Sequence, residues 1–221
     1  MRDHQPHADH KVTLLGGGPV CAKALNRALA LAPRLVAADG GAEHAHRHGH
    51  PVKHIIGDLD SLSNKTTWRN SGIPLTEISE QNSTDFEKCL YTENAEFYIG
   101  LGFLGARLDH TLACLRSLAV YREKRILLIG EDDVVFLCPR TYEISLDSGV
   151  RVSLFPLAEI GGCGSEGLRW PIDGLEFSPL GQIGTSNRAN GGPVRLWFDR
   201  EAMLLILPLA EMENAFRSLG G

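Results

Sequence analysis

Aspartates that follow short apolar runs are the residues of this chain whose types and spacing best suit chemistry. They recur in four short motifs, which are Asp39-Gly40-Gly41, Gly57-Asp58-Leu59-Asp60-Ser61, Ser83-Thr84-Asp85 and Arg107-Leu108-Asp109-His110. In an open α/β sheet, ligands bind outside the carboxyl ends of the strands. Carboxylates gathered at that edge repel one another and need a cation, and Mg²⁺ takes carboxylate oxygens together with phosphate oxygens. The pattern therefore predicts a metal-dependent enzyme that handles phosphate groups.

Asp58 and Asp60 form the sharpest of these motifs. Two carboxylates two residues apart on an extended segment point to the same side. Like charges this close raise each other's pKa unless a cation neutralises them. Because the pair also follows a predicted strand, we interpret it as a metal site rather than as a polar loop that happens to hold two aspartates.

Asp85 and Asp109 each stand in the first turn of a predicted helix. A carboxylate in that place also stabilises the helix through capping and through the helix dipole, so a ligand role and a helix-start role both remain open. Thr84 and Glu87 match a capping box better than a ligand set.

Arg107 and His110 flank Asp109 in the last motif. A guanidinium group matches phosphate oxygens in a bidentate manner, which makes Arg107 a candidate phosphate clamp, with a surface arginine as the alternative. His110 could donate a hydrogen bond to phosphate or be an interior histidine at a helix start. Gly16-Gly17-Gly18 could let a phosphate approach a helix N-terminus, or could be a tight turn without a ligand.

Two polar or aromatic segments in the second half of the chain could bind a ligand. Trp170 lies in a predicted strand, where its face could stack on a flat cationic heterocycle or could be part of the core. Thr185-Ser186-Asn187 is predicted as a polar turn, which could bind through hydroxyl and amide groups or could be a plain turn.

The elements that position these motifs change character near residue 130. The predicted strands of the first half are 12–15, 35–38, 54–56, 97–99 and 126–129, and its predicted helices are 21–31, 84–94 and 109–122. The predicted strands of the second half are 134–137, 142–146, 150–155, 167–170, 194–198 and 202–207. Alternating strands and helices indicate parallel pairing, whereas regularly spaced short strands are typical of a small sandwich. We therefore expect an α/β protein, with a Rossmann-like parallel-sheet domain over 1–131 and a small β-sandwich domain over 132–221.

Composition excludes several classes of protein. The formal net charge of −5 over 221 residues argues against a nucleic-acid surface. No apolar run approaches the ~20 residues of a membrane span, and the polar start lacks a signal-peptide core, so we expect no membrane association. Five scattered cysteines without a CxxC pair favour reduced thiols in a cytosol, with Cys89 and Cys114 as small core residues.

Taken in order, the motifs resemble those of the thiamine pyrophosphokinase (thiamine diphosphokinase) family. The matching segments are Asp39-Gly40-Gly41-Ala42, Gly57-Asp58-Leu59-Asp60-Ser61, Gln81–Lys88, Gly105–His110, Gly167-Leu168-Arg169-Trp170 and Thr185-Ser186-Asn187. The resemblance extends from about Leu14 to the C-terminus. The chain differs from the usual family pattern at Glu43, at Glu80-Gln81-Asn82 and at Ala106.

The resemblance implies an N-terminal catalytic domain that binds ATP and Mg²⁺, and a C-terminal sandwich that binds thiamine. It also implies a cytoplasmic homodimer with active sites at the subunit interface. The implied reaction transfers the pyrophosphoryl group of ATP to the hydroxyl of thiamine, giving thiamine diphosphate and AMP.

The resemblance further assigns roles to single residues. The implied metal ligands, which with Asp109 form the expected catalytic set, are Asp58, Asp60 and Asp85. The implied substrate-binding residues are Asp39, Gly40, Gln81, Arg107, His110, Trp170, Ser186 and Asn187. Asp39 would belong to the same acidic cluster. The resemblance assigns no proton acceptor, and our candidate for accepting the proton of the thiamine hydroxyl is Asp85 or Asp109.

Two alternatives stay open. A metal-dependent hydrolase of nucleotides or phosphoesters would share the acidic cluster but would need no aromatic acceptor pocket. A protein that binds thiamine or a nucleotide without catalysis would need fewer acidic motifs than this chain has. AMP formation that requires thiamine distinguishes the transferase from both.

Overall fold

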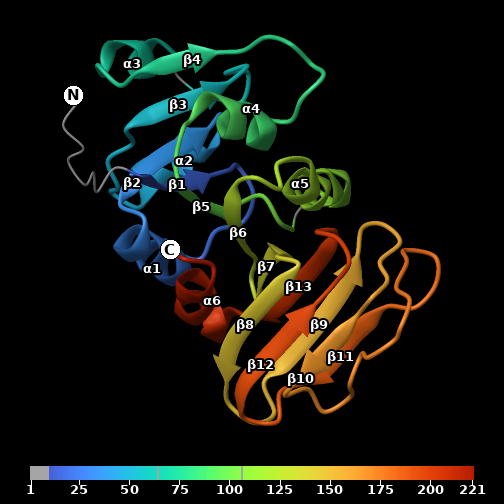
Figure 1. The fold of residues 1–221 in the computed structure, drawn as a ribbon. Helices are drawn as coiled ribbons and strands as arrows, with labels where there is room; N and C mark the ends of the chain where they lie inside the picture. The colour runs from blue at the N-terminus through green and yellow to red at the C-terminus, as the bar shows by residue number, and fades with distance from the viewer. Residues whose placement is uncertain (1–9, 64, 106) are drawn as a thin grey trace, which may run out of the picture. The chain divides into compact units, whose positions relative to one another are not determined.

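A computed structural model describes residues 10–63, 65–105 and 107–221 of the chain (Figure 1). The histidines at positions 4 and 7 and the departure at Ala106 lie outside the described residues. The chain divides into two compact units, one ending at Cys114 and the other beginning at Leu115. The first is built around a parallel sheet and the second from antiparallel strands, so the predicted fold class is confirmed.

Five parallel strands form the sheet of the first unit. They are β1 (Lys11–Leu15), β2 (Arg34–Ala38), β3 (His54–Gly57), β4 (Leu75–Glu77) and β5 (Phe97–Leu101). Their spatial order is β5-β1-β2-β3-β4. The direction of the winding therefore reverses between β1 and β5, and such a switch point opens a crevice at the carboxyl ends of the strands.

Helices connect these strands. They are α1 (Ala22–Leu31), α2 (Gly41–Arg47), α3 (Lys65–Asn70), α4 (Asp85–Thr92) and α5 (Leu108–Val120), the last of which runs across the division between the units. α1 and α5 were predicted from their apolar period and α4 from its capping box, whereas α2, α3 and β4 were not predicted. These three are short, and short elements depend on tertiary packing more than on their own pattern. Leu112, on α5, is 58% exposed.

The second unit is a sandwich of two antiparallel sheets. One has the order β6 (Arg125–Ile129), β7 (Asp133–Cys138), β13 (Met203–Pro208), β9 (Arg151–Pro156) and β11 (Gly184–Arg188). The other has the order β10 (Gly164–Glu166), β12 (Gly192–Trp197) and β8 (Thr141–Leu146). Alternate residues of β8 are buried, as expected when one face of a strand covers a core. A helix, α6 (Met212–Ser218), closes this unit.

Two predictions in the second unit are wrong. The segment 167–170 is not a strand, since it makes only an isolated bridge between Leu168 and Ala189. The chain turns at Gly167, where φ is +78° and a β-carbon would lie 2.2 Å from the carbonyl oxygen of Pro193. Conversely, Thr185-Ser186-Asn187 is not a turn but part of β11. The pairing of β11 with β9 is irregular, with a register shift between Gly184 and Asn187.

A buried carboxylate joins the end of α4 to the amino-terminal ends of the strands. Glu93 Oε1 lies 2.6 Å from Nδ1 of His54, and both of its oxygens accept hydrogen bonds from Arg34 at 3.3 Å. The other ring nitrogen of His54 lies 2.7 Å from the hydroxyl of Thr76. Because the network is on the side of the sheet away from the carboxyl ends, it stabilises the fold without approaching the crevice.

Replacing this carboxylate should destabilise the protein. We expect Glu93→Ala to lower the free energy of unfolding by about 3 kcal/mol, since it leaves buried partners unpaired. The exposed acid Glu96 is a matched control, and Glu96→Ala should change stability by less than about 0.5 kcal/mol. Urea unfolding of both variants measures the difference, and equal losses would contradict the assigned role of Glu93.

Candidate functional site

Two glycine segments meet at the switch point of the parallel sheet. The amide of Gly16, after β1, donates to the carbonyl of Leu101 at 2.8 Å, and the amide of Gly18 donates to the carbonyl of Gly102 at 2.9 Å. A β-carbon on Gly16 or Gly18 would lie 2.5 or 2.7 Å from the Gly102 oxygen. Gly16 and Gly18 are therefore required for the close approach of two backbone segments, whether or not a phosphate also binds there, whereas Gly17 has room for a β-carbon.

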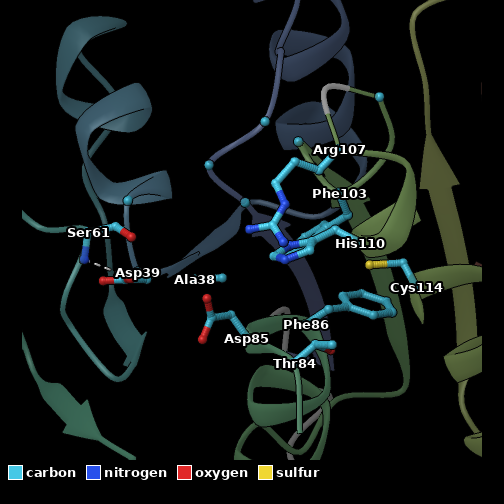
Figure 2. A pocket seen from close by; sticks show the side chains of 16 residues that line it. Ala38, Asp39, Ser61, Thr84, Asp85, Phe86, Phe103, Arg107, His110 and Cys114 are labelled. Atoms are coloured by element: carbon cyan, nitrogen blue, oxygen red, sulfur yellow. Dashed lines mark hydrogen bonds between the residues drawn. The ribbon is translucent and has the colours of Figure 1, made fainter. Parts of the chain in front are cut away.

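A cavity of about 450 Å³ opens beside these glycines (Figure 2). Its lining residues are Gly16, Gly17, Gly18, Ala38, Asp39, Gly40, Ser61, Thr84, Asp85, Phe86, Gly102, Phe103, Gly105, Arg107, His110 and Cys114. Asp39 and Ser61 lie on one side of it, whereas Phe86, Phe103 and Cys114 gather on the other. The cavity thus has a carboxylate side and an apolar, aromatic side, which suits a ligand with a charged part and a flat part.

Asp39 is the most buried carboxylate of the cavity, at 3% exposure. It follows β2 and has a φ of 43°, which is uncommon for a residue other than glycine. Its Oδ2 accepts a hydrogen bond from the amide of Ser61 at 3.1 Å, whereas none of the described residues donates to Oδ1. Burial raises the pKa of Asp39, and the charges of Asp85 and Asp58 add to the effect. A buried oxygen without a partner is a position where a donor or a cation would bind favourably.

Asp58 and Asp60 do not lie on an extended segment, contrary to the prediction. Leu59, between them, is buried and has a φ of 62°, so the chain turns and the amide of Asp60 donates to Asp58 Oδ1 at 3.1 Å. This hydrogen bond is the main reason why the pKa of Asp58 is lowered rather than raised. The side chain of Asp60 is 80% exposed and pairs with Lys65 at 3.1 Å. Because of this turn, the two carboxylates have different neighbours: Asp58 accepts a hydrogen bond within the turn, whereas Asp60 faces solvent beside Lys65.

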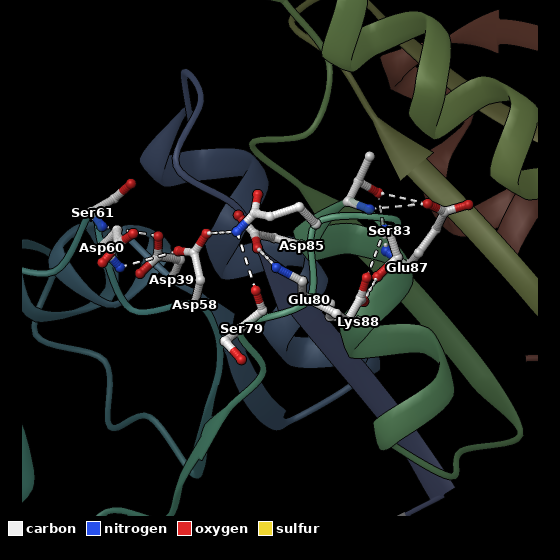
Figure 3. Close-up of polar contacts among 12 residues, drawn as sticks. Asp39, Asp58, Asp60, Ser61, Ser79, Glu80, Ser83, Asp85, Glu87 and Lys88 are labelled. Atoms are coloured by element: carbon white, nitrogen blue, oxygen red, sulfur yellow. Dashed lines mark hydrogen bonds and ion pairs between the residues drawn. The ribbon is translucent and has the colours of Figure 1, made fainter.

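Gln81 lies beside Asp58, which Figure 3 shows together with Ser79 and Glu80. Its amide nitrogen donates to Asp58 Oδ2 at 3.3 Å and to the carbonyl of Ser79 at 3.4 Å. The loop that holds Gln81 is fixed by Glu80, which accepts hydrogen bonds from the amides of Asn82 and Ser83.

The predicted capping box at the start of α4 is confirmed. Thr84 accepts from the amide of Glu87 at 3.3 Å, and the Glu87 carboxylate accepts from the amide of Thr84 at 3.0 Å. Because these two side chains cap the helix, Asp85 is left to face the cavity. Asp85 Oδ1 also accepts a hydrogen bond from Lys88 at 3.3 Å.

Arg107 and Asp109 form an ion pair with each other, apart from the carboxylates on the acidic side of the cavity. Their side chains form two hydrogen bonds, of 2.6 and 3.2 Å, and the bond to Arg107 is the main cause of the lowered pKa of Asp109. Arg107 and His110 line the cavity, whereas Asp109 is absent from its described lining. The structure therefore brings Asp39, Asp58 and Asp85 near one another and leaves Asp109 apart.

A second cavity, of about 330 Å³, lies within the second unit. Its lining residues are Trp170, Pro171, Ile172, Leu175, Phe177, Gln182, Ile183, Gly184, Thr185, Ser186 and Asn187. Trp170 is 51% exposed, so it is not a core residue. The Asn187 side chain accepts from the amide of Trp170 at 3.2 Å and donates to its carbonyl at 2.7 Å, which fixes the segment that carries the indole.

Ser186 has a φ of 66°, and its amide donates to the hydroxyl of Ser153 at 3.0 Å. Strain of this kind is found mostly at functional sites. The predicted residues Trp170, Ser186 and Asn187 are therefore brought together by the fold, although the segments that carry them were assigned the wrong secondary structure.

Several lining residues were missed at the level of sequence. They are Ser61, Phe86, Phe103 and Cys114. Phe86 and Phe103 pack with ring centroids 4.7 Å apart, and burial raises the pKa of Cys114 to about 12. An apolar residue in a helix is indistinguishable from an ordinary core residue until its neighbours are known. All five cysteines are free, as predicted, and both Cys89 and Cys114 are buried.

Two family models match the chain. The model described as thiamin pyrophosphokinase, catalytic domain, matches residues 25–129, and the model described as thiamin pyrophosphokinase, vitamin B1 binding domain, matches residues 141–202. The first match contains the lining residues of the first cavity from Ala38 to Cys114 but begins after Gly16-Gly17-Gly18, and the second match contains the cavity around Trp170.

Curated relatives show the same likeness over part of their length. Thiamine pyrophosphokinase 3 of Oryza sativa subsp. japonica is 32% identical over 151 residues, which are 60% of this chain and 57% of the relative. Thiamine pyrophosphokinase 1 of the same plant is 31% identical over 170 residues, which are 69% of this chain and 64% of the relative. The matched part of the chain thus spans about 60% of the length of these proteins.

Solved structures show the likeness of fold. The thiamin pyrophosphokinase from Candida albicans superposes with a TM-score of 0.80 at 20% identity, over 90% of this chain and 89% of that one. Yeast thiamin pyrophosphokinase superposes with a TM-score of 0.76 at 21% identity, over 92% and 88%. With both family models matched in order along the chain, this protein belongs to the thiamin pyrophosphokinase family.

Proposed function

We propose that this protein is a thiamine pyrophosphokinase, which transfers the pyrophosphoryl group of ATP to the hydroxyl of thiamine and releases thiamine diphosphate and AMP. The observation that carries the proposal is the cavity at the switch point, where carboxylates face an aromatic wall and a backbone of glycines. The predicted alternative, a hydrolase of nucleotides or phosphoesters, finds no support among the matched families.

The acidic side of the cavity fits Mg²⁺ that is shared with phosphate. Mg²⁺ is usually held by one or two carboxylates and by substrate phosphates, not by a complete protein cage. Among the described residues no three acidic, histidine or cysteine side chains form such a cage, but Asp39 Oδ1 lacks a partner and Asp58 and Asp85 lie nearby. We propose Asp58, Asp60 and Asp85 as the ligands, for which Asp60 would exchange its ion pair with Lys65. Bound there, Mg²⁺ would offset the negative charge of the phosphates.

The residues around this cluster would bind and orient the nucleotide. Arg107 could exchange Asp109 for a phosphate, because guanidinium binds both anions in the same bidentate manner. Gln81 and His110 supply further donors, and Gly40 leaves its backbone open to a ligand. Both oxygens of Asp109 are paired with Arg107 and Asp109 is not among the described lining residues, whereas Asp85 faces the cavity. We therefore favour Asp85 as the group that accepts the proton of the thiamine hydroxyl.

The cavity around Trp170 would hold thiamine. The indole is half exposed and already has the Arg169 guanidinium over its ring, with Cζ 4.8 Å from the centroid, so it suits stacking on a cationic heterocycle that takes the place of this group or binds the other face. Ser186 and Asn187 hold the surrounding backbone. Leu108 and Leu112 form an exposed apolar pair one turn apart on α5, as expected for a surface that a second subunit covers. We propose a homodimer on this basis.

A cytoplasmic location is also proposed, because all five cysteines are free thiols. Separately, none of the helices in the described ranges combines the length and the apolar character that a membrane crossing requires.

The decisive activity assay measures AMP. With ATP and Mg²⁺, we expect AMP release only when thiamine is present, with an equal amount of thiamine diphosphate detected by chromatography. ADP or free phosphate released without regard to thiamine would instead indicate a hydrolase. Thiamine binding without any AMP release would indicate a binding protein.

Asp58→Asn should abolish transfer while leaving the fold intact. We expect kcat to fall by about 100-fold or more, since the substitution removes a charge that the transition state requires. Circular dichroism and the melting temperature should be close to those of the original protein, because Asp58 is only partly buried. Asp147→Asn, at an exposed position after β8, is the matched control and should keep full activity. Near-normal turnover of folded Asp58→Asn would overturn the metal assignment.

Trp170→Ala should act mainly on thiamine. Loss of stacking worth about 1–2 kcal/mol corresponds to a rise in the KM for thiamine of about 5- to 30-fold. The KM for ATP should change little, and Trp170→Phe should recover part of the loss. An equal rise in both KM values would contradict a thiamine-specific role.

A further inference from the structure

Lys88 is a buried ammonium group behind the acidic side of the cavity. The residue is 2% exposed and lies on α4, one turn after Asp85. Burying an ammonium group is costly unless it is paired, and the partner that the described residues provide is Asp85 Oδ1, 3.3 Å from Nζ. Figure 3 shows the side chains of Asp85 and Lys88 together with that of Asp58.

The position of Lys88 separates it from the substrate-binding wall. Asp85 and Phe86 line the cavity, whereas Lys88 is not part of its described lining. An ammonium group that is so buried is poorly placed to reach a ligand directly. It is well placed to act on Asp85, by holding Oδ1 and leaving Oδ2 without a hydrogen bond from the described residues.

The charge of Lys88 reaches more than one carboxylate. The pKa of Asp58 is lowered first by the amide of Asp60 and then, among smaller causes, by the Lys88 ammonium. Asp39, Asp58 and Asp85 together would carry up to three negative charges. The Lys88 ammonium, 3.3 Å from Asp85 Oδ1, therefore offsets part of this charge before any metal ion binds.

We propose that Lys88 is a positioning residue for pyrophosphoryl transfer, whose ammonium orients the Asp85 carboxylate toward the cavity and limits the negative charge of the acidic cluster. The inference rests on the proposed function, because it gives Asp85 a part in the reaction. The contacts of Lys88 alone indicate that it acts through Asp85 and not on a substrate.

Two substitutions in the full-length protein separate orientation from charge. Lys88→Met removes both the hydrogen bond and the charge at a similar side-chain length, whereas Lys88→Gln removes the charge and keeps a donor. Lys23→Met, on the exposed side of α1, removes the same charge far from the buried position and is the control. The measurements are the melting temperature, kcat at saturating Mg²⁺, and the Kd of Mn²⁺ as a metal probe without nucleotide.

We expect Lys88→Met to lower kcat at least tenfold and to bind Mn²⁺ at least threefold more tightly, because a competing cation has gone. Lys88→Gln should bind Mn²⁺ as tightly as Lys88→Met does. Its kcat should fall less than that of Lys88→Met, because its amide still orients Asp85. A purely structural role would lower the melting temperature and leave both Mn²⁺ affinity and kcat of the folded fraction unchanged. That outcome, or weaker Mn²⁺ binding, would overturn the proposal.

The same experiment in an Asp85→Asn background tests whether Lys88 acts through Asp85. There, Lys88→Met should change the Kd of Mn²⁺ clearly less than it does when Asp85 is present, because only the effect of its charge on Asp58 remains, and non-additive effects of this kind identify coupled residues. If Asp85→Asn alone keeps full activity, the proposed catalytic role of Asp85 fails. If Asp85→Asn is inactive but Lys88→Met behaves like the original protein, only the inference about Lys88 fails.

Discussion

The close approach of two backbone segments at the switch point of the parallel sheet is the constraint on which the rest of the site depends. Gly16 and Gly18 donate to the carbonyls of Leu101, the last residue of β5, and of Gly102. Gly41 leaves no room for a β-carbon, which would lie 1.9 Å from the Leu15 oxygen. Because side chains are excluded here, a cavity with a backbone floor remains at the carboxyl ends of the strands. The functional side chains stand around that floor instead of filling it.

Local strain and unpaired charge concentrate around the two cavities. Within the described ranges, the non-glycine residues with positive φ are Asp39, Leu59 and Ser186. The first two shape the acidic side of one cavity, and the third lies in the wall of the other. Such conformations persist only where the surrounding structure enforces them, which suggests that the geometry of these segments serves binding and not stability. The network around Glu93 supports the sheet from its opposite end.

The two units supply different parts of the proposed reaction. The first offers carboxylates, glycine amides and an arginine, which together suit a metal and a polyphosphate. The second offers an exposed indole framed by short polar side chains, which suits a cationic heterocycle. A hydrolase would require only the first set of groups. The presence of both sets in one chain is what favours transfer of a pyrophosphoryl group to an organic acceptor over transfer to water.

Features that depend on neighbours in the chain were determined by the sequence alone. They are the apolar strands β1, β2 and β3, the capping box at Thr84 and the change near residue 130 from alternating strands and helices to short strands.

Features that depend on distant partners were decided only by the tertiary structure. The turn at Leu59 directs Asp60 to Lys65, and Arg107 holds Asp109 apart from the other carboxylates. Thr185-Ser186-Asn187 became a strand because β9 was available to pair with it. Lys88 could not be recognised as buried, since its position on α4 carries no sign of the carboxylates packed beside it. Spacing along the chain indicates which groups exist, but ion pairs and hydrogen bonds between distant segments decide which of them meet.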